Sequence, residues 1–160
     1  MRHLEDYGTT EQLASLYEVQ RARVSTYRSF DRSLEQILKM GNLSVYPVAC
    51  TNATASFVIL SNTINIIKEI LEKNFGRNDL RRLIEQLQQR EKEKLNLTVE
   101  LHLERIREKN SSHSGDDRIG KFLNQGIIDL HNKLSSCIDE INEILDELKY
   151  ATVEETVESR

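Results

Sequence analysis

The stretch that decides the fold is residues 79–109, DLRRLIEQLQQREKEKLNLTVELHLERIREK. Stepped at about 100° per residue, its apolar side chains fall on more than one side of a helix. An early cluster is followed by a later one: Leu80, Leu83, Ile84 and Leu87, then Leu95, Val99, Leu103 and Ile106. Leu97 and Leu101 point roughly opposite to the later cluster. A helix with apolar residues on two sides needs packing partners on two sides.

The same stretch contains a competing signal, because apolar and other residues alternate strictly from Leu95 to Leu103. Strict alternation is also typical of a β-strand. Strong helix formers lie on both sides, at residues 91–94 and 104–109. The sequence holds no other convincing strand with which this one could pair. We therefore expect one continuous helix.

Two further helices are predicted before this stretch. After a loose lead-in at residues 1–8, the first begins near Thr9, which has capping-box spacing to Gln12, and runs to about Met40. The polar Gln20 interrupts its apolar line, which is Leu13, Leu16, Val24, Tyr27, Phe30, Leu34, Ile37 and Leu38.

The second helix starts between Ser44 and Pro47, because proline is tolerated only in the first turn. Charge is almost absent until Lys68, so we expect much of this helix to be central and buried. It ends at Phe75 with Gly76 as a left-handed cap. Its heptad seam is Tyr46, Cys50, Ala53, Phe57, Leu60, Ile64, Ile67 and Leu71.

Residues 110–115, NSSHSG, have the composition of a flexible linker. Asp116 or Asp117 then caps a fourth helix that runs to about Tyr150, and the last ten residues are expected to fray. Its seam is Ile127, Leu130, Leu134, Cys137, Ile141, Ile144 and Leu148. Its opposite face is acidic, with Asp139, Glu140, Glu143, Asp146 and Glu147.

These segments predict an all-α protein, an antiparallel bundle of three to four long helices with heptad-like packing. A single domain covers residues 9–150, with a core at 9–109, the linker at 110–115 and the fourth helix at 116–150. Residues 1–8 and 151–160 are expected to be flexible ends. The linker lets the fourth helix close the bundle or dock on another copy of the chain.

Composition and charge narrow the function class. The chain has 160 residues, one proline, six glycines and no tryptophan, which favours long helices over a sandwich or an α/β enzyme. The first 115 residues carry 17 basic and 15 acidic side chains, whereas the last 45 carry 5 and 11. No segment has the basicity of a dedicated nucleic-acid binder.

The cysteine content and the N-terminus indicate a location inside the cell. Cys50 and Cys137 fall on apolar helical positions, so reduced core thiols are favoured over a disulfide between them. The N-terminus has no apolar run of the kind found in signal peptides, and no stretch has 18 consecutive apolar residues. We expect a nuclear or cytoplasmic protein that has no membrane-spanning helix. Four glycosylation sequons are then chance matches.

We find no motif that indicates catalysis or cofactor binding. A Walker loop, a dinucleotide fingerprint, a nucleophile elbow and paired Glu-x-x-His motifs are all absent from the sequence. The histidines have no ligand set near them and are expected to be surface or hydrogen-bonded residues: His3, His102, His113 and His131. The sequence thus predicts no enzyme activity, no metal and no cofactor.

Two basic groups were weighed as phosphate contacts. Arg28 and Arg32 lie one turn apart on the first helix, and Arg77, Arg81 and Arg82 lie at the turn between the second and third. Ordinary surface charge, balanced by neighbouring Glu, is the favoured interpretation. Direct nucleic-acid binding stays open as an alternative. It would need several phosphate contacts at once to matter at physiological salt.

The run from Leu87 to Thr98, LQQREKEKLNLT, lies within residues 83–107, which resemble the signature of the required-for-excision B-type family. Residues 17–38, with Tyr27, Arg28 and Phe30, resemble the family's first helix, and residues 57–67 its second. The resemblance covers about residues 13–107 and leaves the fourth helix unmatched. It implies a small helical protein, without enzyme activity, that is associated with DNA excision repair.

Three functions remain open from the sequence. The first is a repair adaptor that contacts protein partners, with the acidic face of the fourth helix as a further contact. Its predicted partner-binding residues are Leu95, Leu97, Val99, Leu101, Leu103 and Ile106. The second is a structural coiled-coil subunit of a cytoskeletal or trafficking assembly, in which the chain could form a homo-oligomer. The third is a weak nucleic-acid binder.

Overall fold

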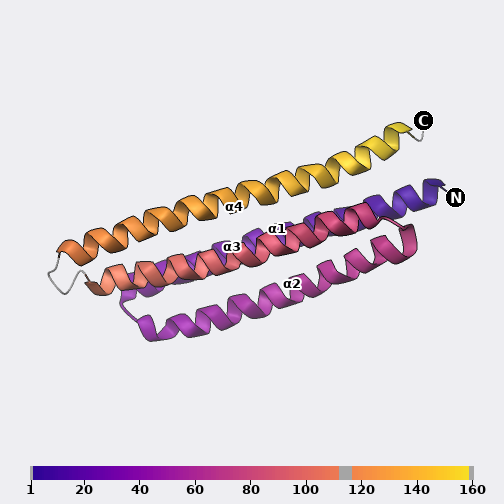
Figure 1. Ribbon diagram of the computed structural model, residues 1–160. Coiled ribbons are helices and arrows are strands. Elements are labelled where there is room, and N and C mark those ends of the chain that lie inside the picture. Colours follow the sequence, from indigo (N-terminus) through magenta and orange to yellow (C-terminus); the bar gives the residue numbers. More distant parts are fainter. Residues whose placement is uncertain (1, 112–116, 159–160) are drawn as a thin grey trace.

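The computed structural model describes residues 2–111 and 117–158, and every element in those ranges is helical. The elements are α1 (Arg2–Met40), the short 3-10 turn η1 (Leu43–Val45), α2 (Tyr46–Phe75), α3 (Asn78–Ser111) and α4 (Asp117–Glu158). They run alternately in opposite directions along one elongated bundle (Figure 1). The predicted all-α antiparallel bundle is confirmed. The alternating segment Leu95 to Leu103 is part of α3 rather than a strand.

Both ends of the chain are more helical than expected. The predicted loose lead-in is wrong, because α1 already begins at Arg2 and Thr9, only 2% exposed, lies inside the helix rather than at its cap. No proline precedes Thr9, so nothing in the sequence stops the helix there. The helix α4 likewise continues past its predicted end near Tyr150, to Glu158. Most of the predicted linker, and Asp116, lie outside the described residues.

Two predicted turn signals are confirmed. Pro47 lies in the first turn of α2, where its missing N–H leaves no helical hydrogen bond unmade. Gly76 adopts φ 62° and ψ 22°, the left-handed conformation that glycine adopts without steric cost. The N–H of Gly76 donates to Glu72 O at 3.0 Å and that of Arg77 to Leu71 O at 2.9 Å. These bonds end α2 and reverse the chain into α3.

The buried residues form two clusters that differ in the helices they join. The first includes Leu16, Ile64, Ile84 and Ile141, and it joins all four helices. The second is rich in aromatic residues, such as Phe30 and Phe57, and it contains residues from α1, α2 and α3. The helix α4 therefore closes the bundle around the first cluster, while elsewhere it packs mainly along α3.

The core face of α1 differs from the predicted apolar line. Val24 is 44% exposed, whereas Gln20 and Arg23 are buried. Most of its buried residues are spaced alternately three and four apart, with Val19 buried beside them: Leu13, Leu16, Gln20, Arg23, Tyr27, Phe30, Leu34 and Ile37. Two polar residues therefore occupy regular positions in the middle of a heptad seam.

The prediction that much of α2 is central and buried is wrong. Its heptad seam faces the core, but α2 lies at the edge of the bundle (Figure 1) and its outer face is exposed. By length and composition alone, Leu43–Phe75 is apolar enough to cross a membrane, and 17% of its most apolar stretch is buried. Mostly buried core helices of soluble proteins pass the same test, but this stretch is mostly exposed. The expected absence of membrane contact therefore stays a prediction.

Candidate functional site

A groove of about 900 Å³ runs between α1 and α4. It exists because α4 packs along α3 and contacts α1 at few positions. Apolar side chains from both helices line it, including Val24 on α1 and Ile138, Ile141 and Leu145 on α4. Glu91 and Lys94 of α3 also line it. The groove thus has walls from two helices and polar groups from a third.

A buried polar layer crosses the bundle at Glu91. The side-chain amide of Gln20 donates to Glu91 Oε1 at 2.9 Å, and Arg23 Nη1 lies 3.9 Å from the same oxygen. Arg23 donates from Nη1 to Gln20 Oε1 and from Nη2 to Ser61 Oγ, both at 3.1 Å. The side chains of Arg23 and Glu91 are 5% and 6% exposed. The layer connects α1, α2 and α3 at mid-length.

Two buried oxygens that belong to groove residues lack a hydrogen-bond partner among the described residues: Glu91 Oε2 and Tyr17 Oη. Burial, with a smaller contribution from nearby Asp146, raises the pKa of Tyr17, so its hydroxyl stays protonated at neutral pH. A buried acceptor without a donor costs about 1–3 kcal/mol. Glu91 lines both this groove and a smaller one between α1, α2 and α3.

The edge of the groove carries cations held over aromatic rings. Lys94 Nζ lies 4.2 Å from the centre of the Tyr27 ring, and Lys149 Nζ lies 5.7 Å from that of Tyr17. A cation over a ring face is stabilised by the ring quadrupole. These contacts hold positive charge beside the apolar walls.

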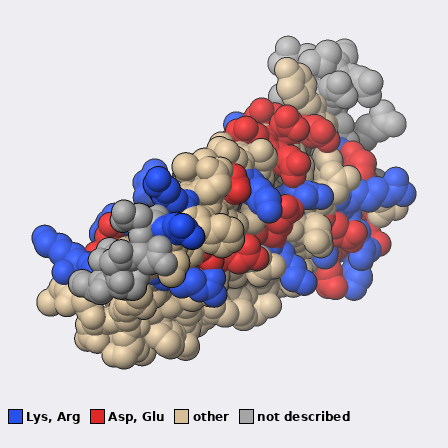
Figure 2. Space-filling model, turned by 60° about the vertical axis from the view of Figure 1, so that its left-hand side comes forward, with Lys and Arg blue, Asp and Glu red and all other residues tan. Residues whose placement is uncertain are grey.

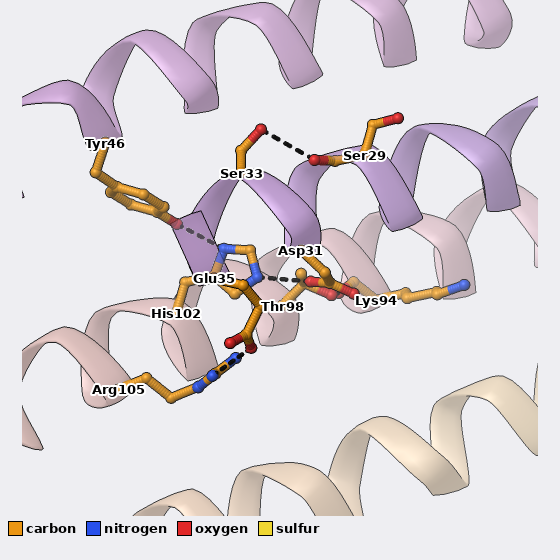
Figure 3. Close-up of polar contacts among 9 residues, drawn as sticks. All are labelled: Ser29, Asp31, Ser33, Glu35, Tyr46, Lys94, Thr98, His102 and Arg105. Atoms are coloured by element: carbon orange, nitrogen blue, oxygen red, sulfur yellow. Dashed lines mark hydrogen bonds and ion pairs between the residues drawn. The ribbon is translucent and has the colours of Figure 1, made fainter. Parts of the chain in front are cut away.

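A second polar chain joins α1, α2 and α3 closer to the end of the bundle at which η1 connects α1 to α2 (Figure 3). Tyr46 Oη and His102 Nδ1 lie 3.0 Å apart, and His102 Nε2 lies 2.7 Å from Asp31 Oδ1. Burial raises the pKa of Tyr46, with a further contribution from its hydrogen bond to Cys50. The Asp31 carboxylate can only accept, so the Nε2–H of His102 donates to it. In the neutral tautomer that carries this hydrogen, Nδ1 accepts from the Tyr46 hydroxyl. The histidine is 1% exposed and is a hydrogen-bonded core residue.

The family model for DNA repair REX1-B matches residues 11–105. The match spans most of α1, all of α2 and α3 as far as Arg105. The chain belongs to the DNA repair REX1-B family. The resemblance seen in the sequence is thereby confirmed over nearly the same residues. No curated protein and no solved structure matches the chain.

The REX1-B match contains both polar chains but only part of the groove. Gln20, Arg23, Ser61 and Glu91 all lie within residues 11–105, as do the α1 wall and Lys94. The α4 wall lies outside the match. In this member of the REX1-B family, α4 therefore adds the second wall to a surface that the family helices provide.

The six predicted partner-binding residues are mostly covered by the chain's own helices. Leu101 is 6% exposed, and Leu97 packs against the cluster that α4 completes. Leu95, Val99 and Ile106 are half-buried against the aromatic cluster of α1 and α2. The helix α3 thus finds its packing partners on two sides within this REX1-B chain.

Leu103 is the most exposed of the six, at 39%. It lines a second groove of about 520 Å³ between α3 and α4, together with Phe122. Phe122 is 80% exposed. This groove is the part of the predicted surface that a partner can reach in the closed bundle.

The basic side chains at the turn between α2 and α3 are largely paired with acids. Arg77 donates to both carboxylate oxygens of Asp79, at 3.0 and 2.8 Å. Arg81 forms ion pairs with Glu72 and Glu85. Phosphate contacts from Arg77 and Arg81 would have to replace these pairs.

The two basic groups are also far apart. Arg28, Arg32 and Arg82 are exposed. The turn lies beside the start of α1, since Phe75 is adjacent to Gly8. At 1.5 Å per residue, Arg28 lies about 30 Å further along α1. The fold therefore does not combine the two groups into one patch, and nucleic-acid binding stays an untested alternative.

The ligand-type side chains of the described segments do not form a metal site, since no group of three or more His, Cys, Asp or Glu is suitably arranged there. Cys50 is half-buried and Cys137 is buried, and both are free thiols, as predicted. Cys137 Sγ donates to the carbonyl of Arg90 at 3.2 Å. Burial raises the pKa of the Cys137 thiol, and nearby Glu side chains raise it further.

Sequence analysis missed the central residue of the groove. Glu91 belongs to the run from Arg90 to Lys94, which the sequence indicated only as a strong helix former. The available signal was register, because Leu80, Ile84 and Leu87 continue to Glu91 with spacings of four, three and four. An acid on a seam position, opposite a seam that contains Gln20 and Arg23, indicates a buried polar layer.

Proposed function

We propose that the chain is a non-enzymatic adaptor in DNA excision repair that holds an amphipathic helix of a partner protein in the groove between α1 and α4. Family membership supports the repair context. The observation that carries the proposal is the groove itself, with apolar walls and a buried carboxylate oxygen for which the described part of the chain supplies no donor. Such an adaptor acts in the nucleus, where excision repair takes place.

The dimensions of the groove suit a helix. Its α1 wall extends from Glu11 to Arg28, which is about 26 Å at 1.5 Å per residue. A partner helix of the same length has four to five turns. Helices that bind in grooves insert apolar anchors at positions i, i+3 or i+4, and i+7. Val24, Ile138, Ile141 and Leu145 offer the apolar surface for such anchors.

The charges of the groove specify the partner further. We expect a lysine, arginine or side-chain amide near the middle of the partner helix, because its N–H can satisfy Glu91 Oε2. Arg28, Lys94 and Lys149 line the same groove. Acidic residues beside the apolar stripe of the partner helix can pair with them.

We propose no catalytic step. The arrangement of Asp31, His102 and Tyr46 has the order of a proton relay, but its histidine is 1% exposed and packs against the ring of Phe30 at 4.5 Å. We assign the relay to structure, as a connection between α1, α2 and α3. The predicted residues Leu95 to Ile106 contribute to partner binding through Leu103, unless the bundle opens.

The test uses substitutions that fill the groove without disturbing the core. Ala14 is exposed and lines the groove, whereas Ala22 is exposed on the same helix and does not line it. Ala14→Arg should remove the partner, and the matched Ala22→Arg should retain it, because only the first side chain obstructs the groove. Circular dichroism confirms that both variants stay helical.

The measurement is photo-cross-linking in cells, with a benzophenone amino acid placed at position 14 or 22, followed by mass spectrometry of the linked peptides. We expect position 14 to link to one helical segment of an excision-repair protein, and position 22 to give no such link. Equal linking at both positions, or links from position 14 only to proteins outside repair, contradicts the proposal.

A further inference from the structure

The helix α2 carries a second heptad seam on the face opposite its core seam. From Leu43 to Ile67 the chain has no charged residue, although 30% of the whole chain is charged. The members of this outer seam are spaced alternately four and three apart: Val48, Asn52, Ala55, Ile59, Asn62 and Ile66. All six are exposed, and Val48, Ile59 and Ile66 are 57%, 66% and 60% exposed.

Figure 2 shows where this face lies. A broad tan area without Lys, Arg, Asp or Glu extends along the lower edge of the molecule, the edge at which α2 lies in Figure 1. The acidic side chains lie instead in the upper part, in the centre and along the right-hand side. An uncharged helix face with heptad spacing is typical of a helix that packs against another helix.

We propose that two copies of this chain associate through the outer seam of α2, with the two α2 helices antiparallel. The inference is independent of the proposed repair function, because none of the seam residues lines the groove between α1 and α4. A pair related by a twofold axis uses the same surface on both copies, so the seam must be complementary to itself.

The outer seam has this self-complementarity about its midpoint near Phe57. In an antiparallel pair centred there, Val48 of one copy lies opposite Ile66 of the other. Asn52 lies opposite Asn62, and Ala55 lies opposite Ile59. Each apolar layer thus combines a larger with a smaller side chain, and the two asparagines can hydrogen-bond across the interface. Even layers of this kind keep two helices at a constant separation.

The parallel arrangement fits less well. It places each residue opposite its own copy, so a layer of two Ala55 side chains is followed by layers of two Ile59 and two Ile66. Adjacent layers then differ strongly in volume and leave a gap at Ala55, and a void in a packed interface is unfavourable. Buried asparagines that face each other fix the register of paired helices. Asparagine faces asparagine in either arrangement, so the distinction rests on the apolar layers, and only the antiparallel register combines a larger with a smaller side chain in each of them.

The area predicts a weak dimer. From Val48 to Ile66 the seam is about 27 Å long, and a helix is roughly 10 Å wide, so each copy buries about 270 Å². A standard stable interface buries about 800 Å² on each partner. We therefore expect association at high micromolar concentration, visible as a dependence of mass on concentration.

The first test is sedimentation equilibrium of the full chain from low micromolar to millimolar concentration. We expect the weight-average mass to rise from 18.6 kDa toward twice that value. Ile59→Lys should weaken the dimer at least tenfold. Ile128→Lys is the matched control, because Ile128 is a 47% exposed isoleucine on α4, away from the seam. A constant mass of 18.6 kDa at all concentrations overturns the proposal. So does an equal weakening of the dimer by Ile59→Lys and Ile128→Lys.

The second test establishes the orientation by oxidative cross-linking. The antiparallel arrangement predicts that N52C/N62C forms an intermolecular disulfide. N52C alone should form no more disulfide-linked dimer than the parent chain, which carries the same native thiols. Efficient linking of N52C alone indicates a parallel pair and contradicts the proposed register. Flotation with phosphatidylcholine vesicles tests whether the outer seam binds a membrane instead of a second copy. Binding that Ile59→Lys abolishes, without any dimer in solution, identifies a membrane surface and overturns the proposal.

Discussion

Removal of the positive charge from the buried polar layer should destabilise the protein severely. The change is Arg23→Met, which keeps a long unbranched side chain but removes the guanidinium group. Arg23 Nη1 lies 3.9 Å from Glu91 Oε1, and both side chains are almost fully buried. Without Arg23, the carboxylate of Glu91 keeps Gln20 as its donor and loses the ion pair with Arg23.

The expected loss is about 3–5 kcal/mol, the usual cost of breaking a buried ion pair by removing one partner. A Coulomb energy at 3.9 Å gives a similar figure, about 4 kcal/mol at an effective dielectric constant of 20. Ser61 Oγ and Gln20 Oε1 also lose the donors that Arg23 supplies. Since whole domains are stable by about 5–15 kcal/mol, the variant should be near its limit of stability.

The assay is equilibrium unfolding in urea, followed by circular dichroism, of the wild type, Arg23→Met, Glu91→Met and the double variant. Each single variant leaves one buried charge unpaired and should lose about 3–5 kcal/mol. The double variant leaves no buried charge and should lose clearly less than the sum of the two single losses, with a remaining cost because Gln20 loses both of its partners. A loss below about 1 kcal/mol in Arg23→Met, or additive losses in the double variant, would refute the pairing of these two residues.

Three further predictions concern local contacts. Gly8→Ala should lower the free energy of unfolding in urea by about 1–3 kcal/mol, because the new Cβ would lie 2.3 Å from the Phe75 ring. Gly120→Ala, in open space on α4, should raise it by up to about 1 kcal/mol. Equal effects of the two changes would refute the close approach of Gly8 to Phe75. The hydrogen bond from Arg77 holds the pKa of Asp79 below its ordinary value of 3.8. The ionised form therefore stabilises the fold above pH 3.8, and the stability difference between the wild type and Asp79→Asn should vanish as the pH falls through the folded pKa; a difference that persists at pH 2 would contradict this. Cys137 is buried and its pKa is raised, so iodoacetamide at pH 8 should label it only in unfolding concentrations of urea, as mass spectrometry can show; rapid labelling of the native protein would contradict its burial.

The regular parts of the fold follow directly from the sequence. The core seam of α2 was predicted residue by residue, and so was the seam of α4 from Cys137 to Leu148, because heptad spacing of apolar side chains is a local property. Gly76 and Pro47 marked the turn and the start of α2 for equally local reasons of backbone conformation. Periodicity and turn chemistry therefore predict which faces pack.

The polar layer could not be predicted in the same way. Interpretation of the α1 seam placed Val24 in the core instead of Arg23, because charged residues are rarely buried unless they are paired. The partner of Arg23 lies on α3, 68 positions later in the chain, so its burial depends on tertiary structure. The same reasoning explains the error over α2. Absence of charge predicted burial, but it does not determine which element lies at the edge of the bundle.

The groove depends on the path of α4. Its sequence seam shows which face packs, but α1 and α3 both offer apolar surface to it. The structure places α4 along α3 and away from α1, and the groove is the result. The predicted residues Leu95 to Ile106 were chosen because α3 has apolar surface on two sides. The chain covers most of that surface itself.

The account rests on the claim that the chain acts in excision repair through the groove between α1 and α4. The most direct test is the rate of removal of ultraviolet photoproducts in cells that lack the chain and re-express either Ala14→Arg or Ala22→Arg. We predict slow removal without the chain, full restoration by Ala22→Arg and no restoration by Ala14→Arg at equal protein levels. Equal restoration by the two variants, or normal removal without the chain, would contradict the claim.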